Sequence, residues 1–479
     1  MSSSPSKPEH TDGPVVLERK PWLVDRVLRN ALVAAFLVRL IPLLVWMFDS
    51  CLRDECTYVR LAFRFGEGEG MTGSAGWIWA PGYPFLMGLF AGTMGWPEGI
   101  KVIQLPVSLL ACVLVYQLAR LAFPENRRAA RIAAWMYAVS PHMAFFAIRL
   151  WSEVLYGTIL LGGLLLLLRS RDDVDRAVDR AGWVKTALVG LIGGICVLFR
   201  GVATYMLPIW MFSVLWGRWR EKKAWAQVCL LAVVAASTVA PYSMYASNKF
   251  EGRIVSDRTM GQMMWLGNND FDPITFDYGN GQLARQAFKR TKKKGRSASK
   301  CGKKTQAYTR DKCQTEAGFA WIKANPETFV RRMPMRVAQL LNPHSLLTRH
   351  LRWGRFPGMP QWFDELIILF GCLHSMGTMV LGAVGLAGRG RRSQAVLFSL
   401  ILLYHCAAIA ALAGLSRYRV PLEPLLMIYA AGVLADPRAF FSQIMAEKWR
   451  GVVIVAGLCM LIPLVFWFLP AGWPWWRTW

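Results

Sequence analysis

The sequence predicts an all-helical, polytopic membrane protein with about eleven transmembrane helices. Of its 479 residues, 54% are hydrophobic and 22 are tryptophan, and its long apolar runs carry almost no charge. A soluble protein of this length would show polar faces between its apolar stripes, so we expect these runs to lie in a bilayer. No signal peptide is expected, because the first apolar segment follows a polar stretch and lacks a small-residue cleavage site.

Apolar segments of bilayer length recur along the chain. The expected spans are 22–48, 100–122, 129–148, 150–168, 184–199, 202–217, 224–246, 362–387, 394–412, 418–435 and 451–469. Residues 81–96 are apolar but short and rich in glycine, which favours an interfacial or re-entrant helix. Arg39 stands inside the first span, where a charge is expensive. The chain is therefore expected to divide into four parts. Residues 1–21 are a disordered cytoplasmic tail, and residues 22–246 are a transmembrane module with a catalytic outer loop at 49–99. Residues 247–361 are an extracytoplasmic region, and residues 362–479 are the C-terminal transmembrane helices.

Basic residues predict the orientation of these spans. With the N-terminus inside, every inside loop is basic, as the positive-inside rule requires. The short outside loops hold only Arg149, Arg200, Arg417 and Arg419. The net charge of +26 indicates basic cytoplasmic loops and contact with anionic lipids, and no nucleic-acid-binding motif accompanies it. The polar parts of 49–99 and 247–361 are then expected on the same outer face.

Two adjacent carboxylates, Asp54 and Glu55, follow the first span. A short helical pattern comes after them, and glycines from Gly66 to Gly76 then favour a loop. Charges beside a span are costly unless they face water or a cavity, so Asp54 is a candidate general base. A plain solvated loop is the alternative. Glu55 is expected to orient Asp54 or act beside it, or equally to serve as a helix cap or surface residue.

Five stretches in order resemble membrane glycosyltransferases of the C-type fold, which include the protein O-mannosyltransferases and the bacterial aminoarabinose transferases of lipid A. They are the DE pair followed by PGYPFLMGLF, SPHMAFFAIRLWSEVLYGTILL at 140–161, LFRGVATYMLP at 198–208, EAGFAWIKANPETFVRRMPMRVAQLLNP at 316–343 and LSRYRVPLEPLLMIYAAGVL at 415–434. The resemblance implies a sugar donor on a polyprenyl phosphate, transfer on the extracytoplasmic face and Asp54 as the general base. The chain departs from the family at Trp79 and Ala80, where an acidic or histidine residue is frequent, and in the basic run after Gly281.

Such a transfer needs a base for the acceptor hydroxyl and a cation for the leaving polyprenyl phosphate. Arginine is a fixed, bidentate partner for phosphate. We expect the outer-face arginines to bind the leaving phosphate. Arg200 and Arg417 are the strongest candidates, followed by Arg419 and Arg149. Snorkelling to lipid headgroups is the alternative for each. Glu153, four residues after Arg149, is expected to pair with an arginine rather than to catalyse.

The remaining signals in the outer loops are weaker. Tyr83 and Trp79 could stack on a sugar ring, although interfacial anchoring is the commoner role of such residues. Asp270, Asp272 and Asp277 resemble a loose cation site, but they lack EF-hand spacing. We expect an ordinary loop there, and neither a required metal nor a cofactor.

The outer loops also contain cysteines and a basic run. The run 285–313 is either a solvated insertion or a docking surface for an acidic acceptor or anionic lipid. Cys51 and Cys56 flank Asp54, while Cys301 and Cys313 lie in the long loop. In an oxidising compartment, either a Cys301–Cys313 bridge or a bridge tying the two loops together is possible.

These observations predict a glycosyltransferase of a bacterial inner membrane that acts on the periplasmic side. Its partners would be a lipid-linked sugar donor, a lipid, glycan or protein acceptor and membrane lipids, without nucleic acid. A transporter or flippase of a lipid-linked substrate is one alternative. It is disfavoured because the sequence shows no repeat and its charges gather at one face. A non-catalytic, donor-binding subunit is the other.

Overall fold

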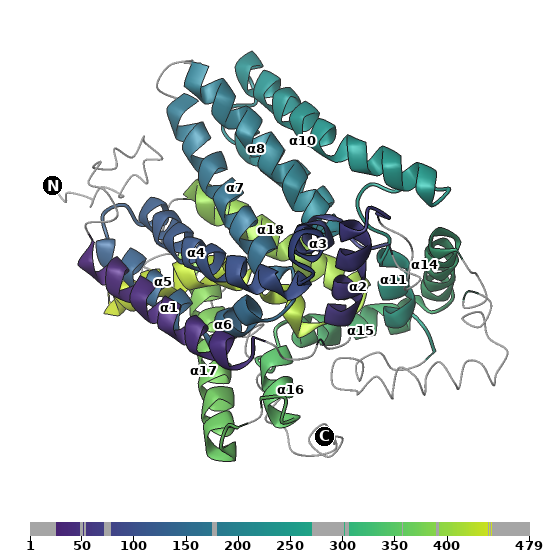
Figure 1. The fold of residues 1–479 in the computed structure, drawn as a ribbon. Helices are drawn as coiled ribbons and strands as arrows, with labels where there is room; N and C mark the ends of the chain where they lie inside the picture. The colour runs from purple at the N-terminus through teal and green to yellow at the C-terminus, as the bar shows by residue number, and fades with distance from the viewer. Residues whose placement is uncertain are drawn as a thin grey trace.

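The helical prediction is confirmed for the part of the chain that the structure, a computed structural model, describes. That part comprises residues 25–47, 51, 54–70, 78–174, 180–270, 301, 306–356, 358–388, 392–438, 440 and 442. Its regular secondary structure is helical, apart from one isolated antiparallel bridge between Ile78 and Arg258. The long helices pack together as a bundle (Figure 1).

Seven helices among the described residues are long and apolar enough to cross a membrane. They are α1 (Arg26–Val45), α4 (Ile100–Ala122), α7 (Glu153–Val174), α8 (Arg180–Phe199), α10 (Lys222–Lys249), α17 (Gln361–Gly388) and α18 (Arg392–Ala411). Each overlaps one of the predicted spans. The chain is therefore an integral membrane protein, as its composition predicted.

Three other predicted spans are broken or shortened, those at 129–148, 202–217 and 418–435. In their place stand α5 (Arg127–Val139), α6 (Pro141–Ile148), η3 (Gly201–Met206), α9 (Leu207–Leu215), η5 (Ser416–Arg419) and α19 (Glu423–Ala435). Pro141 separates α5 from α6 because proline has no N–H to continue the helix. The span predicted at 451–469 lies outside the described residues, as does the tail at 1–21, so the count of eleven is not confirmed.

Short helices from the two predicted outer loops lie at one end of the bundle, in the right half of Figure 1. They are α2 (Asp54–Gly66), α3 (Gly82–Met94), α11 (Met260–Gly267), α14 (Ala307–Ala324) and α15 (Pro326–Leu340), with α16 (Leu346–Arg352) next along the chain. α2 and α3 cross closely, since a Cβ on Gly66 would lie 2.7 Å from the backbone nitrogen of Gly92. This close approach fixes the axis of α2, which carries Asp54 at its start.

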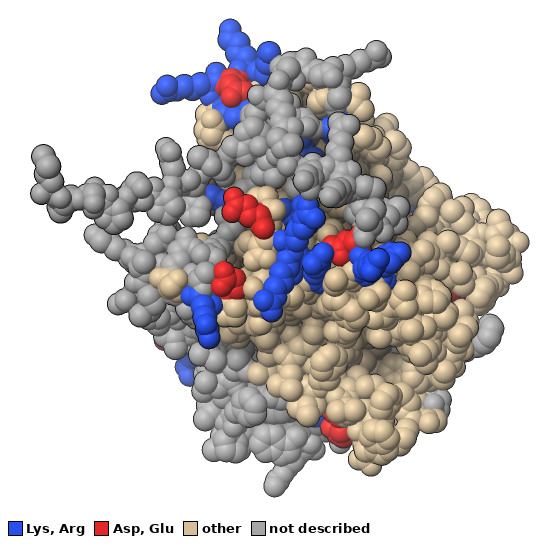
Figure 2. All heavy atoms as spheres, turned by 90° about the vertical axis from the view of Figure 1, so that its left-hand side faces the viewer, with Lys and Arg blue, Asp and Glu red and all other residues tan. Residues whose placement is uncertain are grey.

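The opposite end of the bundle, where α1 begins, is basic. Figure 2 looks onto this end and shows Lys and Arg side chains gathered on it. Arg26, Arg29, Arg127 and Arg128, which lie in the first turns of α1 and α5, are all exposed. The basic residues and the short outer helices therefore occupy opposite ends of the bundle, as the loop charges predicted.

Arg39, the charged residue inside the first span, is satisfied within the bundle. Its buried side chain donates to Ser108 Oγ at 2.7 Å and to the carbonyl oxygens of Ala35, Tyr137 and Ala138 at 3.0, 3.2 and 2.8 Å. Tyr137 and Ala138 lie in the last turn of α5, where carbonyls lack intrahelical donors. The guanidinium thus caps α5 from a neighbouring helix, and its charge suits the negative end of the helix dipole.

Replacing Arg39 with Met is expected to lower thermal stability. The change removes the side-chain donor of the buried Ala138 carbonyl, and an unsatisfied buried group costs about 1–3 kcal/mol. The measurement is the Tm of the detergent-purified protein. Arg29→Met, at an exposed position of the same helix, is the control and should leave the Tm nearly unchanged. Equal Tm values for both variants would rule out this capping role.

Candidate functional site

Asp54, the first residue of α2, forms an ion pair with Arg417 of η5. The distance from Asp54 Oδ2 to Arg417 Nη1 is 2.9 Å. The Asp54 side chain is 38% exposed, whereas that of Arg417 is only 12% exposed. The carboxylate therefore keeps contact with water while the guanidinium beside it is largely shielded.

Aromatic rings enclose the Arg417 guanidinium. Its Cζ lies 4.6 Å from the centroid of the Trp151 ring and 5.3 Å from that of Tyr418. Burial alone would lower the pKa of Arg417, but the neighbouring Tyr418 and Asp54 raise it above its ordinary value. Arg417 is therefore a permanent cation held between π faces, which attract cations.

Arg200 reaches the same cluster from the junction of α8 and η3. Its Nη2 lies 2.9 Å from Glu153 Oε1. Its Cζ is 5.7 Å from the Tyr418 ring centroid, so Arg200 and Arg417 share one aromatic neighbour. The expected ion pair of Glu153 is present, but with Arg200 rather than Arg149. Arg149 precedes the start of α7 at Glu153, so the two do not face each other along one helix.

Three buried polar atoms of this cluster have no hydrogen-bond partner within the described part of the chain. They are Arg417 Nε, Trp151 Nε1 and Glu153 Oε2. Buried polar atoms in native proteins are nearly always hydrogen-bonded, to protein or to ordered water. Two donors and one acceptor thus remain unsatisfied within the described residues, and each has almost no exposed surface. We call Asp54, Glu153, Arg200, Arg417 and Trp151 the outer cluster.

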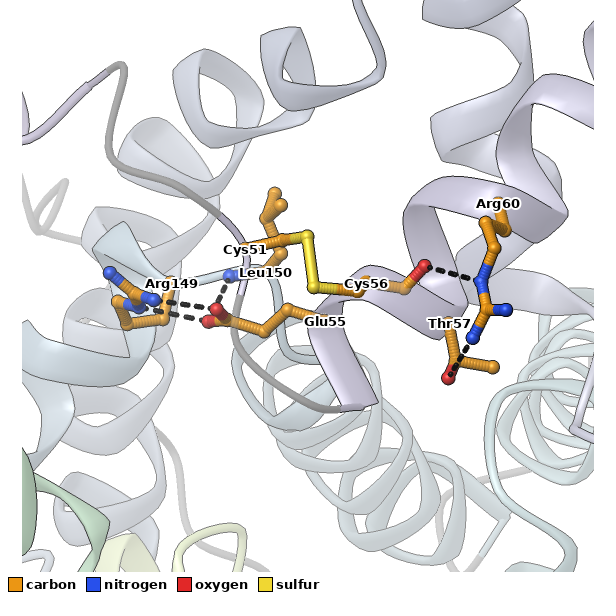
Figure 3. The surroundings of a disulfide bond; sticks show 7 residues. All are labelled: Cys51, Glu55, Cys56, Thr57, Arg60, Arg149 and Leu150. Atoms are coloured by element: carbon orange, nitrogen blue, oxygen red, sulfur yellow. Dashed lines mark hydrogen bonds and ion pairs between the residues drawn. A yellow bond between two sulfur atoms is a disulfide. The ribbon is translucent and has the colours of Figure 1, made fainter. Parts of the chain in front are cut away.

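Glu55 takes a different partner from its neighbour Asp54. Arg149 donates from Nε to Glu55 Oε1 at 2.8 Å and from Nη2 to Oε2 at 2.5 Å, and the Leu150 N–H donates to Oε1 at 3.2 Å (Figure 3). The side chains of Arg149 and Glu55 are only 3% and 1% exposed. Arg149 is therefore committed to an internal ion pair, and we leave it out of the phosphate site that the sequence predicted. Glu55 is buried and so is not a surface residue, while its role of orienting Asp54 stays a prediction.

Two other predicted binding residues have internal partners. Arg419 donates to Glu423 Oε1 at 2.6 Å, to Ser375 Oγ at 3.1 Å and to backbone carbonyls before α16. Tyr83 is fully buried and its hydroxyl donates to Gln104 Oε1 at 2.7 Å. A ring without exposed surface has no open face for a sugar, so we do not assign Tyr83 to sugar binding. Arg419 holds the η5 turn in place, and we do not assign it to a phosphate.

Asp257, in the segment after α10, was not found from the sequence. Its carboxylate accepts a hydrogen bond from the Gly201 N–H and lies near Arg200. A Cβ on Gly201 would overlap this carboxylate, so a side chain at position 201 would displace it. Burial raises the pKa of Asp257 to about 6, although the Gly201 N–H favours the ionised form. Nothing in the sequence marks this contact, because it depends on how the loop returns to η3.

Asp257→Asn is expected to change how stability depends on pH. A raised pKa means that the folded state binds the proton more tightly than the unfolded state. Protonated Asp257 therefore favours the folded state below about pH 4, and this stability is lost as pH rises to about 6. Asparagine does not ionise. The Tm of the variant relative to the native protein should therefore rise between about pH 4 and about pH 6 and stay level above that. A pH-independent difference would contradict the assignment.

The two loops predicted to lie outside contain one disulfide each. Cys301–Cys313, one of the two predicted possibilities, is present. Cys51 pairs with Cys56 within the first loop, so the alternative bridge between the two loops is wrong. The run 285–313 lies mostly outside the described residues.

The possible cation site gains no support. Asp272 and Asp277 lie outside the described residues, and Asp270 Oδ1 accepts a hydrogen bond from Trp321 Nε1 at 3.0 Å. Within the described ranges, no group of three His, Cys, Asp or Glu side chains is arranged to hold a metal ion.

No protein-family model and no curated protein matches the chain in sequence. Among solved structures, it is similar to the oligosaccharyltransferase AglB from Archaeoglobus fulgidus in complex with an inhibitory peptide and a dolichol-phosphate. The identity is 14% and the TM-score 0.47, over 92% of this chain and 54% of AglB. It is also similar to ArnT from Cupriavidus metallidurans bound to undecaprenyl phosphate, with 12% identity and a TM-score of 0.39 over 88% and 79% of the chains. The chain thus spans about half the length of the archaeal protein. Both are membrane glycosyltransferases of the C-type fold.

Proposed function

We propose that this protein is a glycosyltransferase that moves a sugar from a polyprenyl-phosphate donor to an acceptor hydroxyl, with Asp54 as the general base. The observation that carries the proposal is the ion pair of the part-exposed Asp54 with the shielded Arg417. It joins in one contact the two groups that the reaction needs, a base for the acceptor and a cation for the leaving phosphate. The five sequence motifs that resemble C-type glycosyltransferases agree with this chemistry.

In the proposed step, the acceptor oxygen attacks C1 of the sugar while Asp54 takes the hydroxyl proton. The bond between C1 and the phosphate oxygen breaks, and its electron pair leaves with the polyprenyl phosphate. Phosphate is a good leaving group, so a separate general acid is not required. Attack in line with the leaving group inverts the anomeric centre. No metal or cofactor is proposed.

The N–H groups of the outer cluster that lack a partner among the described residues suit the phosphate of the sugar donor. Arg417 uses Nη1 for Asp54, and among the described residues neither its Nε nor Trp151 Nε1 has a partner. We assign these two N–H groups to phosphate oxygens, with Arg200 adding positive charge nearby. One guanidinium then bridges the base and the donor, which fixes the distance between the reacting groups.

Two features support a site on the extracytoplasmic side, which we assign to the periplasm of a bacterial inner membrane. Cys51–Cys56 and Cys301–Cys313 both lie in the predicted outer loops. Disulfides persist in oxidising compartments such as the periplasm. The basic end of the bundle lies opposite, as expected for a cytoplasmic face. The acceptor is proposed to be a lipid, glycan or protein of the cell envelope.

The test is turnover of a labelled donor by the purified protein in liposomes. A panel of polyprenyl-phosphate sugars is supplied with an envelope extract as acceptor, and release of free polyprenyl phosphate is measured together with labelled product. A flippase or a non-catalytic subunit would bind the donor and leave its C1–O bond intact. Mass spectrometry of envelope glycans from cells with and without the protein identifies the sugar and the acceptor.

A further inference from the structure

We propose that the Cys51–Cys56 disulfide and the Glu55–Arg149 ion pair together hold Asp54 in its reactive position, so that turnover depends on the oxidised state of this disulfide. We call these four residues the α2 clamp. The inference rests on the proposed role of Asp54. It assigns a positioning function to residues that do not touch the reacting atoms.

The disulfide forms the covalent half of the α2 clamp. Asp54 is the first residue of α2, and helix ends fray. Cys51 precedes the helix and Cys56 lies in its first turn, with Cα atoms 5.0 Å apart, so the bridge closes a ring that contains Asp54 (Figure 3). The bridge therefore limits the conformations open to the start of α2.

The ion pair forms the second half. Glu55 ties the same helical turn to Arg149 and to the Leu150 N–H, at the junction of α6 and α7. Trp151 and Glu153 follow directly along the chain. The ring centroid of Trp151 lies 4.6 Å from Arg417 Cζ, and Glu153 Oε1 lies 2.9 Å from Arg200 Nη2. The segment that anchors Glu55 thus also carries the partners of both arginines.

The two halves restrict different motions of Asp54. The ion pair fixes the first turn of α2 against the bundle, and the disulfide ties Cys51 to that same turn. A dithiol would break the S–S bond, leaving two thiols on the protein and one disulfide in the dithiol. Both cysteines are half-buried rather than fully buried, so a small reductant can reach them. The buried Glu55–Arg149 pair would persist, and α2 would loosen only at its start.

The second disulfide supplies a matched control. Cys301–Cys313 lies in the other outer loop, and its residues have no place in the outer cluster. We compare Cys51→Ser/Cys56→Ser with Cys301→Ser/Cys313→Ser. The first pair is expected to lower kcat about 10- to 100-fold, because a displacement of about 1 Å at a reacting group has effects of this size. Donor KM should change little, since Arg417 and Trp151 are untouched. The control pair should keep native kcat.

Hydrogen exchange supplies a readout that does not depend on turnover. Amides at the start of α2 should exchange faster in Cys51→Ser/Cys56→Ser, while those of α4 should not change. A dithiol added to the folded Cys301→Ser/Cys313→Ser protein should reproduce the loss of kcat, and reoxidation should restore it. This arm replaces the double serine variant if that variant does not fold.

The possible failures are distinguishable. A native protein that never turns over any lipid-linked sugar overturns the proposed function and with it the catalytic consequence of the clamp. An active native protein whose kcat and α2 exchange are unchanged without the first disulfide overturns the clamp alone. Equal losses of kcat in both cysteine pairs also overturn it, because they indicate general destabilisation.

Discussion

Asp54→Asn is expected to slow sugar transfer about 100- to 10,000-fold while leaving the fold and donor binding intact. Asparagine keeps an oxygen that can accept from Arg417 Nη1, now 2.9 Å from the carboxylate, but it cannot take the acceptor proton. General-base catalysis contributes about 100- to 10,000-fold in rate, so turnover should fall within that range. The measurement is release of labelled product from a polyprenyl-phosphate sugar in liposomes.

Two controls separate loss of chemistry from loss of structure. Glu67→Gln removes an exposed carboxylate just beyond the other end of α2 and should keep native turnover. The rise in Tm that the sugar donor produces measures donor binding. By this measure, the donor affinity of Asp54→Asn should match that of the native protein within a few-fold. Native turnover by Asp54→Asn would remove the proposed mechanism, whatever the controls show.

The sequence predicted the parts of this site that depend on topology. Alternating basic and neutral loops placed Asp54 and Arg417 on one face of the membrane although they are far apart in the chain, and the structure brings them into contact. Apolar length predicted the seven long helices for the same reason, since the bilayer imposes that length on any span. For the loop cysteines, the sequence left open either a Cys301–Cys313 bridge or a bridge between the two loops, and the structure has the first.

Contacts that depend on local packing could not be predicted. The four-residue spacing of Arg149 and Glu153 suggested a pair on one helix, but α7 starts at Glu153 and Arg149 instead meets Glu55. Tyr83 lies on an apolar helix whose buried and exposed faces the sequence does not distinguish. Asp257 belongs to a loop, and only the folded chain shows that it meets Gly201. Which charged or polar side chains on one face pair with one another can be seen only in the three-dimensional structure.

Arg417→Ala is expected to weaken use of the donor far more than use of the acceptor. The guanidinium is the proposed contact for the donor phosphate, and a hydrogen bond to a charged group contributes about 1.5–3 kcal/mol. Donor KM should therefore rise about 10- to 100-fold, with acceptor KM changed only slightly. Arg253→Ala, at an exposed position of the outer segment after α10, is the control for loss of one positive charge.

Arg417→Lys tests whether the fork of the guanidinium matters beyond its charge. Arg417 is proposed to hold Asp54 with Nη1 and the phosphate with Nε, two tasks that require separate donors in a rigid plane. A lysine ammonium is a single point charge, so it can serve the phosphate or Asp54 but cannot fix the distance between them. The lysine variant should therefore recover most of the donor affinity lost in Arg417→Ala while its kcat stays low. Full recovery of both parameters would show that charge alone suffices, and equal changes in donor and acceptor KM would argue against a phosphate contact.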